Sequence, residues 1–186
     1  MQMNKRKTIV SWIPHLVFMA TGIFLDQLTK YYAVVCLKGK DAIVLIPGAL
    51  ELRYLENRGA AFGMMQGGKV LFLIITPIVL LLVFYALAKM PSGGKYGILN
   101  VLLDCVVVGA IGNMADRIRL DYVVDFIYIS LIDFPIFNVA DMFVSISCVA
   151  GAILILFGGR YKDEDFACLI PGKRQGPADG QEDQDA

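Results

Sequence analysis

Two aspartates lie at the edges of strongly apolar segments. Asp125 lies within VVDFI (residues 123–127), and Asp141 ends FNVAD (residues 137–141). A carboxylate beside hydrocarbon is costly unless it has a partner or a function. Where two carboxylates meet, repulsion and burial raise one pKa while the other group can stay ionised. One carboxyl can then activate water while the other protonates a carbonyl, which is the chemistry of peptide hydrolysis. Cation transport through paired carboxylates is the alternative.

The composition indicates that the elements around these aspartates lie in a membrane. Of the 186 residues, 57% are hydrophobic and 18% are charged, whereas soluble domains are about 45–50% apolar and about 25% charged. The formal net charge is zero and no basic stripe is interleaved with aromatic residues, so we expect no nucleic-acid partner. His15 is the single histidine and no C-x-x-C pair occurs. A histidine triad and a metal centre are therefore nearly excluded, and no cofactor is expected.

Four apolar segments predict an all-α membrane protein. A hydrocarbon core needs about 20 mostly apolar residues in helical form. The predicted transmembrane helices are residues 8–30, 69–89, 96–116 and 139–159. They make residues 1–162 one multi-pass membrane domain. Residues 163–186 are rich in Asp, Glu, Gly, Pro and Gln, so we expect a disordered tail there.

The parity of four spans places most of the polar residues at one membrane face. Lys5, Arg6 and Lys7 precede the first span and favour a cytoplasmic N-terminus, and the fourth span returns the C-terminus to the cytoplasm. The extracytoplasmic face then receives Asp26, Lys30, Asn57, Arg58, Asn113, Asp116, Arg117, Asp125, Asn138 and Asp141. A transport pathway needs polar groups across the whole membrane, and only Asn100 and Asp104 offer them. The clustering therefore favours one site at one surface.

The long segment between the first two predicted helices has the pattern of strands. Residues 42–46 are apolar and mostly β-branched, and residues 47–48 are Pro-Gly, which favours a turn. Residues 50–55 alternate apolar and polar side chains, as a half-buried strand does. We expect a small extracytoplasmic β element lying on the membrane surface.

Helical spacing groups several of the polar residues. Asp26 and Lys30 are four residues apart, so they share a helix face and can pair. We expect this pair to support the structure, with direct substrate contact as the alternative. Asn113, Asp116 and Arg117 follow the i, i+3, i+4 spacing and form one polar face. We expect an Asp116–Arg117 pair at its rim, orienting and charging the site.

Two further segments flank the aspartates. Asn138 lies three residues before Asp141 and shares its helix face. The segment NRGAAFG (residues 57–63) is rich in small residues, and glycine permits close backbone approach. It is either a loop that enters the next helix or a wall that admits a bulky ligand near Gly59. In the second reading, Asn57 supplies paired donor and acceptor groups.

Five of these segments together closely resemble the lipoprotein signal peptidase (signal peptidase II) family of bacterial inner membranes. They occur in the order of that family, with compatible spacing, and cover most of residues 25–155. The matching segments are DQLTK (26–30), NRGAAFG (57–63), GNMADR (112–117), VVDFI (123–127) and FNVAD (137–141).

The resemblance implies an aspartyl endopeptidase of the bacterial cytoplasmic (inner) membrane. It would remove the signal peptide from prolipoproteins whose cysteine carries a diacylglyceryl group. Its site would face the extracytoplasmic side among membrane phospholipids, beneath a β-cradle, and would bind globomycin-type inhibitors. Asp125 and Asp141 match the catalytic dyad of the family. The matching polar positions around the site are Asp26, Lys30, Asn57, Asn113, Arg117 and Asn138. Gly59 is added because glycine permits close backbone approach, and Asp116 because it shares a helix face with Asn113 and Arg117.

The chain departs from the family pattern at three positions. Gly109-Ala110 replaces a common Gly-Gly pair, Asp121 stands where glycine is common, and Asp104 is unusual in the third span. An acid four residues from Asp125 would raise its pKa or reshape the loop. Two other classes stay open: a carboxylate-lined ion transporter and a non-catalytic four-span assembly factor.

Overall fold

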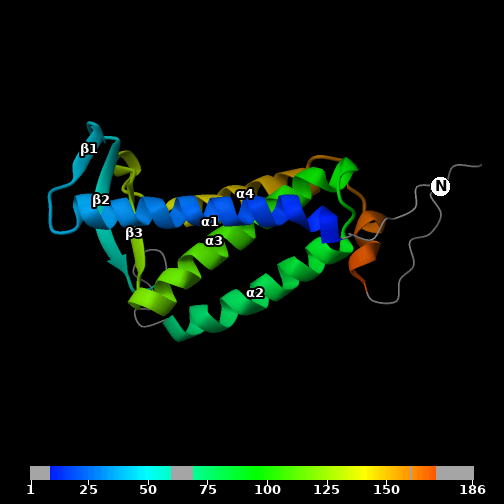
Figure 1. The fold of residues 1–186 in the computed structure, drawn as a ribbon. Helices are drawn as coiled ribbons and strands as arrows, with labels where there is room; N and C mark the ends of the chain where they lie inside the picture. Colours follow the sequence, from blue (N-terminus) through cyan, green and yellow to red (C-terminus); the bar gives the residue numbers. More distant parts are fainter. Residues whose placement is uncertain (1–8, 60–68, 160, 171–186) are drawn as a thin grey trace, which may run out of the picture.

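The computed structural model describes residues 9–59, 69–159 and 161–170. The structure is mostly helical, with a small sheet lying across one end of the helices and a short helical segment at the other end (Figure 1). The helices are α1 (Ile9–Leu37), α2 (Lys69–Lys89), α3 (Gly97–Leu120) and α4 (Val139–Leu156). Short 3-10 helices are η2 (Gly94–Tyr96), η3 (Ser130–Ile132) and η4 (Asp163–Leu169).

Three helices within the described ranges are long and apolar enough to cross a membrane. They are Val70–Lys89, Gly94–Leu120 and Val139–Leu156. The first helix, α1, has sufficient length with 29 residues, but Asp26, Gln27 and Lys30 lie in its second half. The fourth span therefore remains a prediction.

The β element predicted between the first two helices is confirmed as two strands, and a third strand completes the sheet. Strands β1 (Ile43–Ile46), β2 (Leu50–Asn57) and β3 (Val123–Tyr128) are antiparallel in the order β1-β2-β3. No strand was predicted between the third and fourth predicted helices, but Asp125 lies there in β3, opposite Leu55 of β2. The β-branched and aromatic residues of β3 carried the missed strand signal.

Helix α1 extends about two turns beyond its predicted end because the sheet gives those turns a surface to pack on. Ala33 and Leu37 of α1 are buried against Val124 and Phe126 of β3. This packing joins the first helix to the strand that carries Asp125.

Helix α3 approaches α4 closely at Gly109. A Cβ atom on Gly109 would overlap the carbonyl oxygen of Ala140 and lie 2.5 Å from Cγ2 of Val144. Small residues favour close helix packing in membranes, and at position 109 the backbone of the neighbouring helix requires one.

Substituting Gly109→Ala is expected to lower the thermal unfolding temperature in detergent, because overpacking costs about 1–3 kcal/mol, or about 2–12 °C in a chain of this size. The matched control is Gly151→Ala in α4, where the nearest atom to a new Cβ is 3.9 Å away. That variant should be neutral or slightly stabilising, since alanine favours helix more than glycine does. Equal melting temperatures for the two variants would contradict the close approach at Gly109.

Helix α3 ends at Asp121, which adopts the left-handed conformation with φ 69° and ψ 4°. Glycine favours this conformation, and aspartate is one of the few other residues that tolerate it. The place where the family commonly has glycine is thus a helix-ending position. Aspartate can replace glycine at position 121 because it tolerates the left-handed conformation that the backbone adopts there.

Part of the tail that we expected to be disordered is folded. Residues Asp163–Leu169 form η4, and Phe166 packs against the buried cluster that contains Tyr96 and Tyr161. The Lys95 ammonium forms an ion pair with the Asp165 carboxylate. The expectation of disorder was wrong for this segment because these apolar and charged side chains find partners at the ends of α2 and α3. Residues 171–186 lie outside the described residues.

A second polar pair joins α1 to α3 away from the sheet. His15 Nδ1 lies 2.6 Å from Oδ2 of Asp104, and the Asp104 side chain is almost fully buried. Asn100 donates a hydrogen bond of 2.9 Å to the Pro91 carbonyl. These contacts assign His15 and Asp104 to helix packing.

Candidate active site

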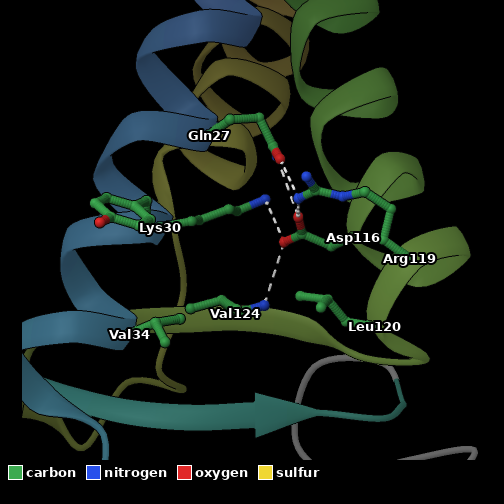
Figure 2. A pocket seen from close by; sticks show the side chains of 8 residues that line it. Gln27, Lys30, Val34, Asp116, Arg119, Leu120 and Val124 are labelled. Atoms are coloured by element: carbon green, nitrogen blue, oxygen red, sulfur yellow. Dashed lines mark hydrogen bonds and ion pairs between the residues drawn. The ribbon is translucent and has the colours of Figure 1, made fainter.

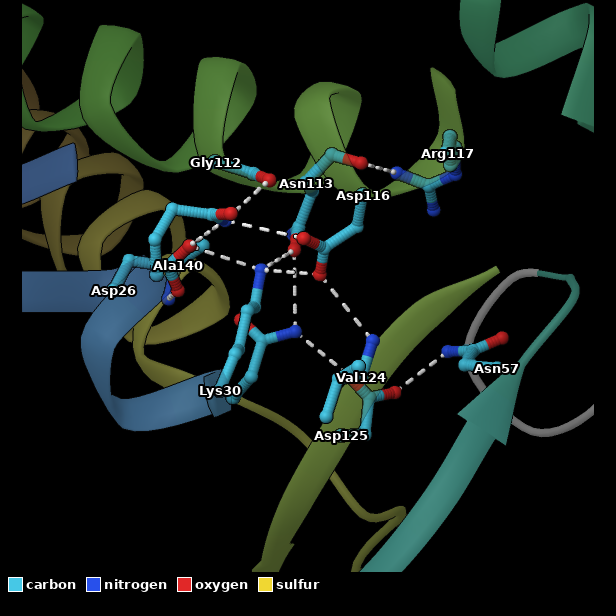
Figure 3. Close-up of polar contacts among 12 residues, drawn as sticks. Asp26, Lys30, Asn57, Gly112, Asn113, Asp116, Arg117, Val124, Asp125 and Ala140 are labelled. Carbon is cyan, nitrogen blue, oxygen red and sulfur yellow. Dashed lines mark hydrogen bonds and ion pairs between the residues drawn. The ribbon is translucent and has the colours of Figure 1, made fainter. Parts of the chain in front are cut away.

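The Asp125 carboxylate is buried and accepts a hydrogen bond on each oxygen. The Asn138 amide donates to Oδ1 at 2.6 Å and the Asn57 amide donates to Oδ2 at 2.8 Å. The Asp125 side chain is 1% exposed. Strands β2 and β3 place Asn57 beside Asp125 (Figure 3). Two amides from separate elements thus hold one carboxylate.

The Asp141 carboxylate lies at the start of α4 in a capping box. The Asn138 backbone N–H donates to Asp141 Oδ2 at 3.1 Å, and the Asp141 backbone N–H donates to Asn138 Oδ1 at 3.0 Å. The Asn113 amide donates to Asp141 Oδ1 at 2.7 Å. A helix N-terminus favours a negative charge through its free N–H groups and its dipole. This position therefore suits an ionised carboxylate.

Asn138 connects the two aspartates, and its orientation is determined by its partners. Its Oδ1 accepts from the Asp141 backbone N–H, which can only donate, so its NH₂ group must face Asp125. Asn57 is oriented in the same way, because its Oδ1 accepts from the Gly59 backbone N–H at 3.0 Å. The backbone N–H of Gly59 thus helps to orient Asn57. Residues 60–63 of the same predicted segment lie outside the described residues.

A buried ammonium group lies behind the two aspartates. Lys30 Nζ is 3.0 Å from Asp26 Oδ2, 3.0 Å from Asp116 Oδ2 and 2.9 Å from Asn113 Oδ1. The three charged side chains are at most 3% exposed. The predicted Asp26–Lys30 pair is confirmed, and Asp116 joins it from α3. Because the ammonium only donates, it also turns the Asn113 NH₂ group toward Asp141.

This cluster of Asp26, Lys30 and Asp116, the Lys30 cluster, binds the backbone next to each candidate catalytic aspartate. Asp26 Oδ1 accepts from the Ala140 N–H at 2.9 Å, and Asp116 Oδ2 accepts from the Val124 N–H at 3.3 Å (Figure 3). Ala140 and Val124 each precede one of the two aspartates. The Lys30 cluster therefore positions α4 and β3 relative to each other.

Gln27 and Arg119 contact the outer side of the Lys30 cluster. Neither was predicted from the sequence as a site residue. Gln27 Nε2 lies within hydrogen-bond distance of Asp26 Oδ2, the Gly112 carbonyl and Asp116 Oδ1, at 3.1 to 3.2 Å. Its Oε1 accepts from Arg119 at 2.6 Å. The sequence did contain an indication for each residue. Gln27 lies inside the segment 26–30, which matches the family, and Arg119 follows Asp116 by three residues and so shares its helix face.

A cavity of about 200 Å³ opens beside this group, between α1, α3 and β3. Figure 2 shows Gln27 and Arg119 reaching across it toward Asp116. The two aspartates do not line it. The cavity therefore lies behind the Lys30 cluster and not at the candidate catalytic pair.

Arg117 does not pair with Asp116 as expected. Asp116 pairs with Lys30 and more distantly with Arg119, while the Arg117 guanidinium lies over the Phe72 ring of α2 at 4.3 Å. Consecutive residues of a helix point about 100° apart, so neighbours in sequence do not face each other. The expected rim pair was wrong for this geometric reason.

The surroundings of Asp125 make it a proton carrier near neutral pH. Burial, and secondly the charge of Asp141, raise the pKa of Asp125 to about 7, while hydrogen bonds from Asn57 and Asn138 and the charge of Lys30 act in the opposite direction. Two neighbouring carboxyl groups, one protonated and one ionised, can supply an acid and a base to the same bond. The geometry is thus suited to adding water to an amide carbonyl.

Comparison with known proteins gives consistent relatives. The family model described as signal peptidase (SPase) II matches residues 18–157. The lipoprotein signal peptidase of Caldanaerobacter subterraneus subsp. tengcongensis is 41% identical over 145 residues, which are 77% of this chain and 97% of that protein. The lipoprotein signal peptidase of Clostridium tetani is 38% identical over 151 residues, covering 80% and 96% of the two chains.

Two solved structures of bacterial membrane enzymes have a similar fold. One superimposes with a TM-score of 0.73 at 31% identity and covers 87% of this chain and 98% of the other. The second gives a TM-score of 0.69 at 32% identity, covering 84% and 99%.

Proposed function

Since this chain belongs to the signal peptidase II family, whose members cleave prolipoprotein signal peptides, we propose that it does so as an intramembrane aspartyl endopeptidase. Its substrates are bacterial prolipoproteins with a diacylglyceryl-modified cysteine. The observation that carries the proposal is the asparagine bridge: Asn138 donates its amide to Asp125 and its backbone N–H to Asp141. Because one residue donates hydrogen bonds to both carboxyl groups, the two groups are held near each other, as a pair acting on one bond must be.

In the proposed mechanism the two aspartates have different tasks. Asp141, stabilised as an anion at the N-terminus of α4, takes a proton from water as the water oxygen bonds to the scissile carbonyl carbon. Asp125 donates its proton to the carbonyl oxygen. On collapse, Asp125 recovers a proton from the tetrahedral intermediate and Asp141 protonates the leaving nitrogen as the carbon–nitrogen bond breaks. The dyad thereby returns to its starting protonation state.

The predicted topology gives this site its place in the membrane. The substrate signal peptide lies between the spans as a helix and its lipid remains in the bilayer. The dyad attacks at the extracytoplasmic surface of the inner membrane beneath the sheet, and both termini are cytoplasmic. Membrane phospholipids surround the site, and globomycin-type inhibitors occupy it in place of substrate.

The purified full-length chain in lipid nanodiscs tests the proposal directly. It should cleave a synthetic prolipoprotein peptide that carries a diacylglyceryl cysteine, leave the unmodified peptide intact, and be inhibited by globomycin. An ion transporter would instead carry a gradient-dependent flux in proteoliposomes without cleavage. A preparation that is folded but cleaves neither peptide would overturn the proposal.

The raised pKa of Asp125 predicts the alkaline side of the pH profile. Because Asp125 must be protonated to act as the acid, kcat/KM should fall as the pH rises through about 7. The measurement is kcat/KM from pH 5 to 9, with enzyme preincubated at each pH and assayed at pH 6 to separate titration from inactivation. A flat profile across pH 6 to 9 would contradict the assignment of Asp125 as the proton donor.

A further inference from the structure

Helix α2 contributes one aromatic ring to the border of the candidate active site. The ring centroid of Phe72 lies 4.3 Å from the Arg117 guanidinium carbon. Phe72 is half-buried and lies in the first turn of α2. A cation over the face of an aromatic ring at this distance is attracted by the ring quadrupole, and more strongly where water is scarce.

The ring is a substantial part of what holds the guanidinium in place. Within the described part of the chain, its hydrogen bond is a long one of 3.4 Å to the Asn113 carbonyl of its own helix. Over a longer range the guanidinium attracts the carboxylates of Asp141 and Asp125. Arg117 is therefore a positive charge beside the dyad that is oriented by packing on α2.

We propose that Phe72 is a positioning residue that holds the Arg117 guanidinium beside the dyad. This inference rests on the proposed peptidase function. In its held position the guanidinium stabilises the negative charge that develops on the substrate carbonyl. It also favours the ionised member of the dyad.

Loss of the ring should release Arg117. Arginine has a long flexible stem, and near a membrane surface such side chains extend toward the polar headgroups. The positive charge would then spend less time beside Asp125 and Asp141. Two effects follow: the transition state loses stabilisation, and the pKa of Asp125 rises further because an opposing positive charge has moved away.

Helix α2 supplies its own matched control. Phe84 is also half-buried but packs against the buried apolar cluster that includes Leu80, Val83 and Leu87. Phe72→Leu and Phe84→Leu are thus the same chemical change in one helix. Among the described residues, Phe72 lies against a cation and Phe84 does not.

Phe72→Leu should lower kcat by about 2- to 30-fold with little change in KM, in keeping with the strength of cation–π contacts. The alkaline limb of its pH profile should move to higher pH. Phe72→Tyr and Phe72→Trp retain a π face and should recover most of the activity. Phe84→Leu should lower the melting temperature and leave the position of the pH limb unchanged.

A double substitution tests whether Phe72 acts through Arg117. In an Arg117→Met background, Phe72→Leu should have no further effect on kcat, because there is no cation left to position. The inference is overturned if Phe72→Leu and Phe84→Leu behave alike, or if the effect of Phe72→Leu persists without Arg117. Either result leaves the proposed peptidase activity standing, since that depends on cleavage by the unsubstituted chain.

Discussion

Asp125→Asn and Asp141→Asn are each expected to abolish prolipoprotein cleavage, with kcat reduced by at least about 10³-fold. An asparagine at either position can neither carry the proton nor accept one from water. Because both steps act on the same bond, neither aspartate can replace the other. The measurement is cleavage of the diacylglyceryl-modified peptide by each purified variant, with inhibitor-sensitive turnover of the unsubstituted chain as reference.

The matched control for this loss is Asp121→Asn. It is the same change from acid to amide, four residues from Asp125, at an exposed position whose left-handed backbone asparagine tolerates. It should retain activity and leave the alkaline limb of the pH profile in place, because burial and Asp141, and not Asp121 as expected from the sequence, raise the pKa of Asp125. Near-normal processing by Asp125→Asn or Asp141→Asn would refute the assignment of the dyad.

The pH dependence of folding stability provides an independent test of the Asp125→Asn variant. The folded-state pKa of Asp125 is raised from 3.8 to about 7, so between these values the folded chain binds more protons than the unfolded chain. Stability should then fall as the pH rises through this window, by the order of 4 kcal/mol at most. Asp125→Asn removes this dependence. Its melting temperature should vary less between pH 5 and 8 than that of the unsubstituted chain.

Lys30→Met is expected to cause the largest loss of stability. The ammonium is 3% exposed and lies 3.0 Å from both Asp26 and Asp116, which are themselves buried. Removing one partner from a buried ionic group leaves uncompensated charge and costs about 3–5 kcal/mol, or at least about 6 °C in melting temperature. Activity should fall with it, because the Lys30 cluster holds the backbone N–H groups next to both aspartates.

Two comparisons separate this effect from a general loss of charge. Lys38→Met removes an ammonium that is half exposed and paired with Glu56, which should cost about 1 kcal/mol or less. The triple variant Asp26→Asn, Lys30→Met, Asp116→Asn leaves no buried charge in the cluster and retains an acceptor oxygen at both outer positions. It should recover part of the melting temperature lost by Lys30→Met. A Lys30→Met variant as stable as Lys38→Met would show that the Lys30 cluster contributes little to the fold.

Much of this site could be predicted where the determining physics is local. Apolar length predicted α2, α3 and α4, and alternation predicted β2. The four-residue spacing of Asp26 and Lys30 predicted their contact, because residues one turn apart share a helix face. Four spans predicted that the polar residues lie on one side of the membrane, and the five segments in family order identified the relatives.

Contacts between distant segments were not predictable in the same way. The expectation of an Asp116–Arg117 pair was wrong. Asp116 forms an ion pair with Lys30 of α1, and the Arg117 guanidinium lies over the Phe72 ring of α2. Such partners depend on how each helix is rotated about its axis. The sequence of one helix does not specify that rotation without its neighbours.

The sequence by itself determined which side chains this protein has for chemistry and which of them share a helical turn, and it predicted that they collect at one membrane face. The tertiary structure alone decided how the dyad is held. Asp125 is placed by a strand that packs on α1, and Asp141 by a helix that Gly109 allows to approach α3. The physical reason is that a buried carboxylate needs donors from several directions, and no single segment of chain can supply them all.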